Sequence, residues 1–258
     1  MRTCIFGENG TLASAIIERK KNLEIYSRTS TNYFNLADVN SFGALDISDS
    51  TIIFTTAISS PETCTKDFRY AWKINVANTL ICIDKLIRQN NRVIFFSSDV
   101  VYGQREHRVS EESSVAPYLP YGLMKYAVEK YFESFKHFFS MRLSYVYTGN
   151  DSFTNHVLDS SHMTIYDGLY RSVVHIEDVI QVIDWIASGE CNHNVINTVG
   201  ASCISRFEFF NYICEDKNIV RSSEVVEPPN GFYDSRPYII NCGSNFLKNS
   251  VTLTDTKL

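Results

Sequence analysis

Two stretches of the sequence carry side chains that could transfer protons. Ser97, Ser98 and Asp99 directly follow the apolar residues 93–96, so they would stand where a strand ends, which is where open α/β sheets bind ligands. Tyr121 and Lys125 are four residues apart, and on a helix this spacing places the phenol and the ammonium on one face, one turn apart. Because a nearby cation stabilises phenolate, we expect Lys125 to lower the pKa of Tyr121 toward the range in which it exchanges protons with a substrate.

A glycine-containing turn near the N-terminus has the pattern of a pyrophosphate-binding turn. The apolar residues 3–6 are followed by Gly7 and Gly10, with Ala13 three residues further on. The glycines let the backbone approach phosphates, and the small alanine permits close packing of a helix on a sheet. At the end of the next apolar run, where an acidic side chain would bind the ribose of NAD, the chain has Ser27 and Arg28. A guanidinium suits a 2′-phosphate, so the sequence favours NADPH over NADH.

The elements that must position these residues alternate along the chain. Short apolar runs typical of strands occupy residues 3–6, 23–26, 51–56 and 92–96, with a further strand-like run at 172–176. Segments with helical spacing of apolar residues occupy residues 11–20, 66–89, 121–137, 177–188 and 205–216. This alternation is typical of βαβ units and predicts an α/β fold with a parallel sheet.

Length and charge limit the classes of protein that the chain can belong to. At 258 residues it is long enough for one large α/β domain with a smaller lobe, and two independent domains are not expected. The net charge of −5 comes without a cluster of lysines and arginines, which gives little support for binding nucleic acid or an anionic membrane.

Cysteine usage and hydropathy indicate the compartment. The seven cysteines are scattered and form no Cys-x-x-Cys pair, which fits reduced thiols in a cytosol. No stretch approaches the roughly 18 apolar residues of a membrane span, and the N-terminal apolar run is too short for the core of a signal peptide. We therefore expect a cytoplasmic protein. No group of His, Cys, Asp and Glu has the spacing of a metal site, so no metal is expected.

Taken together, the motifs resemble the extended short-chain dehydrogenase/reductases, specifically the sugar-nucleotide branch of the NAD-dependent epimerase/dehydratase family and, within it, the dTDP-4-dehydrorhamnose reductase-like proteins. The motifs that carry the resemblance lie at Gly7, Gly10 and Ala13, at residues 73–76 and 98–103, at Tyr121 and Lys125, and at residues 142–147, 174–179 and 235–237. The resemblance implies a Rossmann-type doubly wound parallel sheet with a small C-terminal substrate-binding lobe. Residues 1–150 would form an NADP-binding Rossmann domain with the catalytic residues, and residues 151–258 mainly the lobe, with some segments returning to the Rossmann domain.

The resemblance also implies roles for individual residues. Tyr121 would be the proton donor, Lys125 would bind the nicotinamide ribose and tune Tyr121, and Ser98 would bond to the reacting carbonyl or hydroxyl oxygen. The residues expected to bind the cofactor are Gly7, Asn9, Gly10, Thr11, Leu12, Ser27, Arg28, Thr56, Ala57, Asn75, Tyr121 and Lys125.

Four residues are expected to bind the substrate, namely Ser98, Asp99, Arg171 and Arg236. Related proteins bind the substrate's diphosphate with an arginine placed like Arg236, and the fork of a guanidinium suits phosphate oxygens. The resemblance places Arg171 near the substrate lobe. Two roles are open for Asp99: it could contact a sugar hydroxyl, or it could accept hydrogen bonds from backbone N–H groups of the loop that follows.

The residues after Ser98 narrow the reaction. Dehydratases of this family carry a glutamate base where this chain has Val100, and valine cannot abstract a proton. The combined epimerase/reductases carry a cysteine at the position of Asp99. What remains is NADPH-dependent reduction of a 4-keto-6-deoxy sugar nucleotide, as in deoxysugar and surface polysaccharide synthesis, or 4-epimerisation with bound NAD(P). Arg28 favours the reductase. A non-catalytic NADP-binding sensor or scaffold of the same fold is the third reading.

Two further expectations come from the family pattern. The resemblance suggests a homodimer formed through the helices around residues 66–89 and 121–137, packed as a four-helix interface. The sequence departs from the pattern at two places that border the expected site. Thr148 and Gly149 replace a Gly-Pro pair, and residues 57–65 replace an alanine-rich run.

Overall fold

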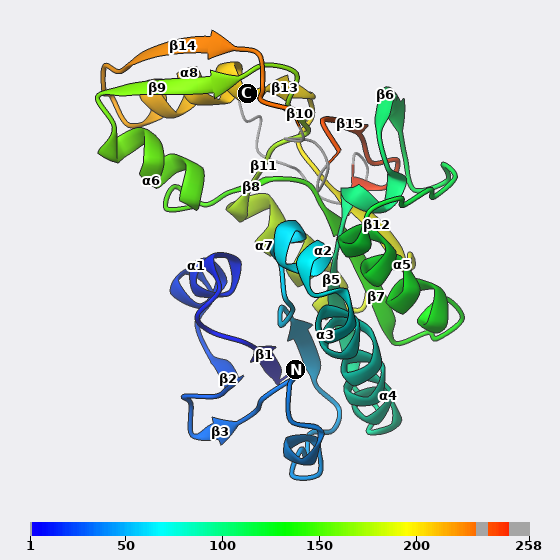
Figure 1. Cartoon of the computed structure of the whole chain (residues 1–258). Coiled ribbons are helices and arrows are strands. Elements are labelled where there is room, and N and C mark those ends of the chain that lie inside the picture. Colours follow the sequence, from blue (N-terminus) through cyan, green and yellow to red (C-terminus); the bar gives the residue numbers. More distant parts are fainter. Residues whose placement is uncertain (1, 231–236, 248–258) are drawn as a thin grey trace.

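A computed structural model describes residues 2–230 and 237–247, and its centre is a sheet of seven parallel strands (Figure 1). The strands lie in the order β12-β7-β5-β4-β1-β2-β3. Their bounds are β1 Thr3–Phe6, β2 Leu23–Ser27, β3 Asn32–Tyr33, β4 Thr51–Phe54, β5 Arg92–Ser98, β7 Phe138–Leu143 and β12 Val195–Thr198. The order reverses between β1 and β4, as in doubly wound nucleotide-binding sheets. The predicted α/β Rossmann-type fold is confirmed.

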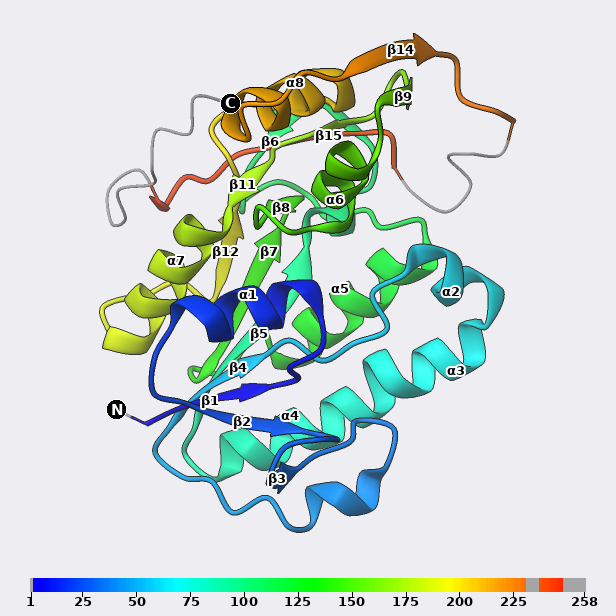
Figure 2. The ribbon, with the colours of Figure 1, turned by 90° about the vertical axis from the view of Figure 1, so that its left-hand side faces the viewer.

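Helices cover both faces of this sheet (Figure 2). On one face lie α1 (Thr11–Arg19) and α7 (Ile176–Ser188); on the other lie α3 (Phe68–Trp72), α4 (Thr79–Arg88) and α5 (Pro120–Phe132). Alternate residues of a strand enter the two cores: Cys4 and Phe6 pack toward α4 and α5, whereas Ile5 packs toward α1 and α7. Because both faces of the sheet are buried, β1, β2, β4 and β5 are largely apolar runs, which is why the sequence revealed these four strands.

A second group of elements lies beyond the carboxyl ends of β5 and β7 (Figure 1), and we call it the upper group. A four-stranded sheet in the order β13-β10-β15-β6 contributes β6 Arg105–Val109, β10 Tyr170–Arg171, β13 Ile204–Ser205 and β15 Ile239–Cys242. Two parallel pairs add β8 Val146–Tyr147 with β11 Val174–His175, and β9 His162–Tyr166 with β14 Ser222–Val226. The helices of the group are α6 Ser152–Asp159 and α8 Arg206–Asp216.

The helical segment predicted at residues 66–89 is more divided than expected. A short helix, α2 (Pro61–Lys66), ends at Asp67, whose carboxylate then accepts the N–H of Tyr70 at 3.2 Å and caps α3. A π-helical stretch, η2 (Lys73–Asn78), joins α3 to α4. Two 3₁₀ turns, η1 (Val39–Phe42) and η3 (Asp99–Tyr102), complete the helical elements of the described residues. The helix predicted at residues 121–137 ends at Phe132.

A buried ion pair fastens α5 to β7. The Arg142 guanidinium donates to the Glu129 carboxylate at 2.6 and 3.1 Å, and both side chains are about 5% exposed or less. Glu129 also accepts the Ser140 hydroxyl at 2.8 Å, and Arg142 donates to the Tyr102 hydroxyl, which in turn donates to Asn197 on β12. Each charge is therefore fully bonded, as burial of a charge requires.

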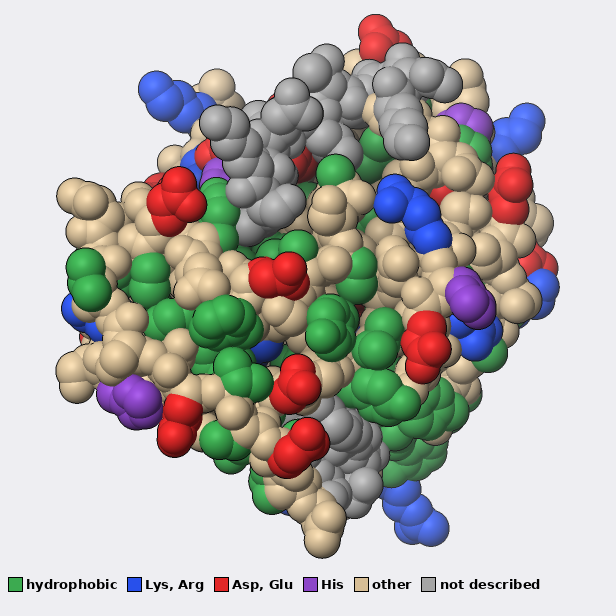
Figure 3. Space-filling view, turned by 90° about the horizontal axis from the view of Figure 1, so that it is seen from above, with side chains coloured by type: hydrophobic (Ala, Val, Ile, Leu, Met, Phe, Trp, Pro, Cys, Tyr) green, Lys and Arg blue, Asp and Glu red, His purple; other side chains and the backbone are tan. Residues whose placement is uncertain are grey.

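The surface seen from above carries charges of both signs, and its basic side chains stand apart from one another (Figure 3). Among the residues described by the structure, no helix has the length and apolar character needed to span a membrane. Over the same residues, no three or more His, Cys, Asp and Glu side chains come together as a metal site would require.

Candidate active site

A cavity of about 650 Å³ opens at the carboxyl edge of the sheet, where the strand order reverses between β1 and β4. Open α/β sheets bind their ligands at this point. The lining includes residues 7–13, Ser27 and Arg28, residues 34–37, residues 55–59, Ile74, residues 96–98, Tyr121 with Lys125, and Leu143, Ser144 and Val146. Eleven of the twelve residues predicted to bind the cofactor are among its lining residues, the exception being Asn75.

The turn between β1 and α1 is shaped for phosphate. Gly7 has a φ of +103°, and a Cβ built on it would lie 2.8 Å from the Thr55 hydroxyl oxygen, so only glycine fits there. A Cβ on Gly10 would meet no atom within 4 Å. Gly10 is also the N-cap of α1, and no side chain bonds to the helix start. The unpaired N–H groups of the first turn and the helix dipole together favour an anion.

The turn after β2 presents Arg28 to the cavity. The Ser27 hydroxyl accepts the N–H groups of Thr29 and Ser30 at 3.1 and 2.9 Å, and this bonding closes the turn. Arg28 is exposed, and no ion pair to it occurs in the described part of the chain. Beside this turn lies Glu8, which also lines the cavity and whose carboxylate accepts a hydrogen bond from the Thr29 hydroxyl. Glu8 belongs to none of the residues expected from the sequence to bind the cofactor. Because Glu8 and Arg28 both line the cavity, opposite charges flank this end of it.

Asn75 lies behind the cavity wall. It is 3% exposed, its side-chain oxygen accepts the N–H of Ile58 at 2.8 Å, and its side-chain nitrogen donates to the carbonyl of Ile58 at 2.9 Å. Ile58 itself lines the cavity. In this structure Asn75 thus holds the loop after β4 in place through Ile58.

Ser98, Tyr121 and Lys125 all line the same cavity. Ser98 ends β5, and its hydroxyl donates to the Asp99 carboxylate at 3.3 Å and accepts the N–H of Val100 at 3.4 Å. Lys125 on α5 donates to the carbonyl of Phe96 at 2.7 Å. Burial lowers the pKa of Lys125 to about 8. The ammonium lies 5.6 Å from the centre of the Tyr121 ring.

The expectation that Lys125 would lower the pKa of Tyr121 is wrong for this structure. Desolvation raises the pKa of Tyr121, and the negative charges of Cys64 (as thiolate) and Asp99 raise it further. Lys125 directs its ammonium to a backbone carbonyl and is itself desolvated. The phenol is therefore held in its protonated form.

A second cavity, of about 500 Å³, lies toward the upper group and shares Ser59 and Tyr121 with the first. Val100 lines this second cavity. Its other lining residues come from α2, from residues 145–152, from residues 169–173 and from the start of α8. Tyr121 therefore stands where the two spaces meet.

The remaining predicted substrate residues have different positions. Arg171 lines the second cavity, but its guanidinium donates to the backbone carbonyls of Tyr170, Pro237 and Tyr238. Asp99 is 2% exposed and lines neither cavity. Burial raises the pKa of Asp99, against the influence of Arg171. Arg236 lies outside the described residues.

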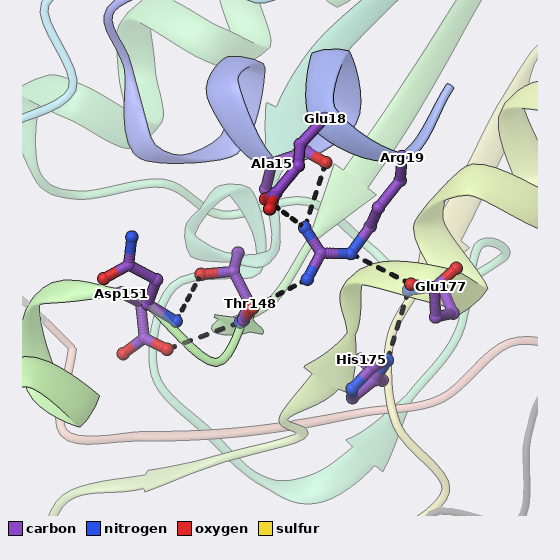
Figure 4. A network of polar contacts seen from close by, with 8 residues as sticks. Ala15, Glu18, Arg19, Thr148, Asp151, His175 and Glu177 are labelled. Atoms are coloured by element: carbon purple, nitrogen blue, oxygen red, sulfur yellow. Dashed lines mark hydrogen bonds and ion pairs between the residues drawn. The ribbon is translucent and has the colours of Figure 1, made fainter. Parts of the chain in front are cut away.

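The departure from the family pattern at residues 148–149 has a structural explanation (Figure 4). Arg19 at the end of α1 donates to the carbonyl of Thr148 at 3.2 Å and to the carboxylate of Glu177 at 2.9 Å. Gly149 has a φ of +76°, which glycine adopts without strain. Asp151 then caps α6 by accepting the N–H of Thr154 at 3.0 Å. These contacts join α1 to the starts of α6 and α7.

Residues 5–196 match the NAD dependent epimerase/dehydratase family, and the chain belongs to this family. The resemblance inferred from the motifs is thereby confirmed. No curated protein sequence matches the chain.

Solved structures with 17–20% sequence identity share the fold over nearly the whole chain. A hypothetical dTDP-4-dehydrorhamnose reductase from Sulfolobus tokodaii is 20% identical, with a TM-score of 0.82 and coverage of 98% of this chain and 96% of that one. The dTDP-4-dehydrorhamnose reductase of Bacillus anthracis, in complex with NADP, is 18% identical, with a TM-score of 0.81 and coverage of 96% and 91%. The UDP-glucose 4-epimerase of Thermus thermophilus, in complex with NAD, is 18% identical, with a TM-score of 0.73 and coverage of 93% and 91%.

Proposed function

We propose that this protein is an NADPH-dependent reductase of a 4-keto-6-deoxy sugar nucleotide, acting in the cytoplasm in deoxysugar or surface polysaccharide synthesis. The observation that carries the proposal is the position of Tyr121, which lines both the cavity at the phosphate-binding turn and the second cavity. In this proposal residues 1–150 bind the cofactor. Residues 151–258 mainly form the substrate lobe, while α7 and β12 return to the central sheet.

The first cavity fits a dinucleotide. Its turn at Gly7 and Gly10 leaves open space before α1 for a pyrophosphate, and Arg28 would take a 2′-phosphate at the far end. Tyr121 and Lys125 would hold the nicotinamide ribose at the inner end. When bound, the nicotinamide supplies the hydride that a carbonyl reduction needs.

The chain's own residues would handle the proton and the developing charge. Ser98 would donate a hydrogen bond to the carbonyl oxygen, and Tyr121 would give its proton to the same oxygen as negative charge develops there. A raised pKa keeps Tyr121 protonated, which is the state that a proton donor needs. Lys125, whose ammonium lies 5.6 Å from the centre of the Tyr121 ring, would bind the nicotinamide ribose beside the proton donor.

Val100 supports reduction over dehydration. Its side chain lines the second cavity, where a proton abstracted from carbon would need a base. An isopropyl group cannot accept that proton, and the neighbouring Asp99 is buried away from both cavities.

Reversible 4-epimerisation is the second candidate, and Glu8 is the observation that favours it. A carboxylate beside the turn after β2 can accept hydrogen bonds from the ribose of NAD. An epimerase would keep one NAD bound throughout the cycle, whereas a reductase must exchange its cofactor.

Turnover with defined substrates separates these candidates. We expect the purified protein to consume NADPH in the presence of one of the dTDP-, UDP-, GDP- or CDP-linked 4-keto-6-deoxy sugars, followed as loss of absorbance, with a single stereochemistry at C4 of the product. Interconversion of 4-epimers without net use of added cofactor would establish the epimerase instead. Tight NADPH binding with no sugar consumed in either assay would favour the sensor or scaffold.

Cofactor selectivity should depend on Arg28. We expect Arg28→Ser to weaken NADPH binding by about tenfold or more, the value of one charge-assisted contact to phosphate, and to leave NADH binding nearly unchanged. Fluorescence titration with NADPH and with NADH measures both dissociation constants. The two cofactors differ only in the 2′-phosphate. Arg88→Ser, at an exposed site on α4, is the matched control. Equal losses for the two cofactors would contradict a role of Arg28 in binding the 2′-phosphate.

We also propose that the protein forms a homodimer through α3, η2, α4 and α5. Large apolar side chains on these helices are exposed to solvent, between 38% and 55% of their surface for Trp72, Ile81, Leu123 and Tyr131. Burial of such residues is what a helical interface supplies.

A further inference from the structure

We infer that Arg206 binds the anionic diphosphate of the substrate in the second cavity. The inference rests on the proposed function, because a nucleotide-linked sugar is the ligand that would bring a diphosphate to this place. Neither the sequence motifs nor the family pattern pointed to Arg206, which is the first residue of α8.

The guanidinium of Arg206 is held by two aromatic rings at the cavity wall. Its central carbon lies 3.8 Å from the centre of the Phe153 ring and 5.4 Å from the centre of the Tyr145 ring. A guanidinium stacked on a ring at this distance keeps its N–H groups at its edges, where they can form a fork to phosphate oxygens. Arg206 and Tyr145 both line the second cavity.

No carboxylate pairs with Arg206 in the described chain. Asp151 is the carboxylate that could do so, since its charge acts on Arg206, but both of its oxygens are used. One accepts the Tyr145 hydroxyl at 2.7 Å and the N–H of Thr154 at 3.0 Å. The other accepts the Thr154 hydroxyl at 2.7 Å and the N–H of Thr148 at 3.4 Å, and Figure 4 shows this last contact. Asp151 therefore fixes the ring beside Arg206 and leaves the cation without an ion pair.

The second cavity has an excess of positive charge among its described lining residues. Arg171 and Arg206 face one carboxylate, that of Glu62, which accepts the Ser60 hydroxyl at 3.1 Å. Burial lowers the pKa of Arg206, and the like charge of Arg171 lowers it further, while Tyr145 opposes the change. A desolvated cation beside another cation is stabilised by an anion from outside.

The two arginines differ in what they can offer a ligand. Arg171 donates to three backbone carbonyls of the sheet formed by β10 and β15, so it holds the cavity wall together. Within the described residues, the guanidinium of Arg206 donates to no backbone carbonyl and lies instead over the rings of Phe153 and Tyr145. A substrate with its sugar at Tyr121 and its diphosphate at Arg206 would lie within one cavity of about 500 Å³, a size typical of small-molecule sites.

Binding without turnover tests this inference. Calorimetry measures the affinities of UDP, dTDP, GDP and CDP, and each is compared with the affinity of its uncharged nucleoside. The measurements are made with and without NADP⁺. For the nucleotide that binds best, we expect Arg206→Leu to weaken binding by about tenfold to a hundredfold, as loss of a charge-assisted contact does. We expect the affinity for the nucleoside to stay within about twofold. Arg206→Lys, which keeps the charge and loses the fork, should fall between Arg206→Leu and the unaltered protein.

Controls separate a lost contact from a lost fold. Arg88→Leu removes the same charge at an exposed site. The affinity for NADP⁺ reports on the first cavity, and the melting temperature reports on folding. Equal losses for nucleotide and nucleoside, or no loss for the nucleotide, would overturn the inference, as would failure of all four nucleotides to bind the unaltered protein. Arg206-dependent nucleotide binding without sugar reduction would leave the inference standing and reject the proposed reductase.

Discussion

Replacement of Tyr121 by phenylalanine is expected to slow substrate-dependent NADPH oxidation by about 10²- to 10⁴-fold, which is the usual contribution of a positioned general acid. The change removes only the hydroxyl, and the ring keeps its place between the two cavities. NADPH affinity should therefore remain within a few-fold of the unaltered protein. Steady-state rates at saturating substrate, together with fluorescence titration of the cofactor, measure the two effects separately.

Tyr126 supplies the control for this experiment. It lies on the same helix, α5, and packs against the core formed by Val101, Tyr102 and their neighbours. Tyr126→Phe makes the same chemical change away from the cavities and should leave the rate within about twofold of the unaltered enzyme. If Tyr121→Phe retained more than a tenth of the rate, another group would have to deliver the proton.

Removal of Glu129 should be the most damaging single change to stability. Glu129→Ala leaves Arg142 buried with no opposite charge, and breaking a buried pair in this way costs about 3–5 kcal/mol. The loss would extend beyond the pair, because Arg142 also bonds Tyr102 and thereby reaches β12 through Asn197. Urea unfolding followed by circular dichroism gives the free energy of unfolding.

The exposed pair of Lys130 and Glu133 is the matched comparison. These two residues lie three apart, with more than half of each side chain exposed. Glu133→Ala should change the free energy of unfolding by less than about 1 kcal/mol, as exposed pairs do. The double replacement Glu129→Met with Arg142→Met removes both buried charges and should recover much of the stability lost in Glu129→Ala. A loss below about 1 kcal/mol in Glu129→Ala would show that water reaches Arg142.

The sequence revealed the parts of the fold whose pattern is continuous. β1, β4 and β5 are fully or largely buried runs, and β2 is a half-buried run with three apolar residues, so length and apolar content were enough to find them. Of the strand-like run predicted at residues 172–176, Val174–His175 form a strand, β11. Strands such as β8, β10 and β13 have two residues each, which is too short for a period of two to be visible. Their pairing is decided by contacts between distant segments, which local sequence cannot display.

The candidate site was predictable where the backbone imposed a residue type. Gly7 and Gly10 are needed for their conformation or for open space, and Tyr121 and Lys125 share a helix face. The electrostatics were less accessible, because the pKa of Tyr121 follows from its burial and from Asp99 and Cys64, which are distant in sequence. Arg206 was missed for the same reason. Its guanidinium is held over the rings of Phe153 and Tyr145, and both residues are distant from Arg206 in sequence.

The pairing of β15 with β6 and β10 sets an order in time for the assembly of the protein. All residues lining the first cavity lie between 7 and 146, and β12 completes the central sheet at residue 198. The strand that joins β6 to β10, by contrast, is residues 239–242. Because chains are synthesised from the N-terminus and folding can begin during synthesis, a nascent chain would have every residue that lines the first cavity before it could close the sheet that carries Arg171. The wall of the second cavity, which Arg171 lines, is thus among the last parts of the molecule to form.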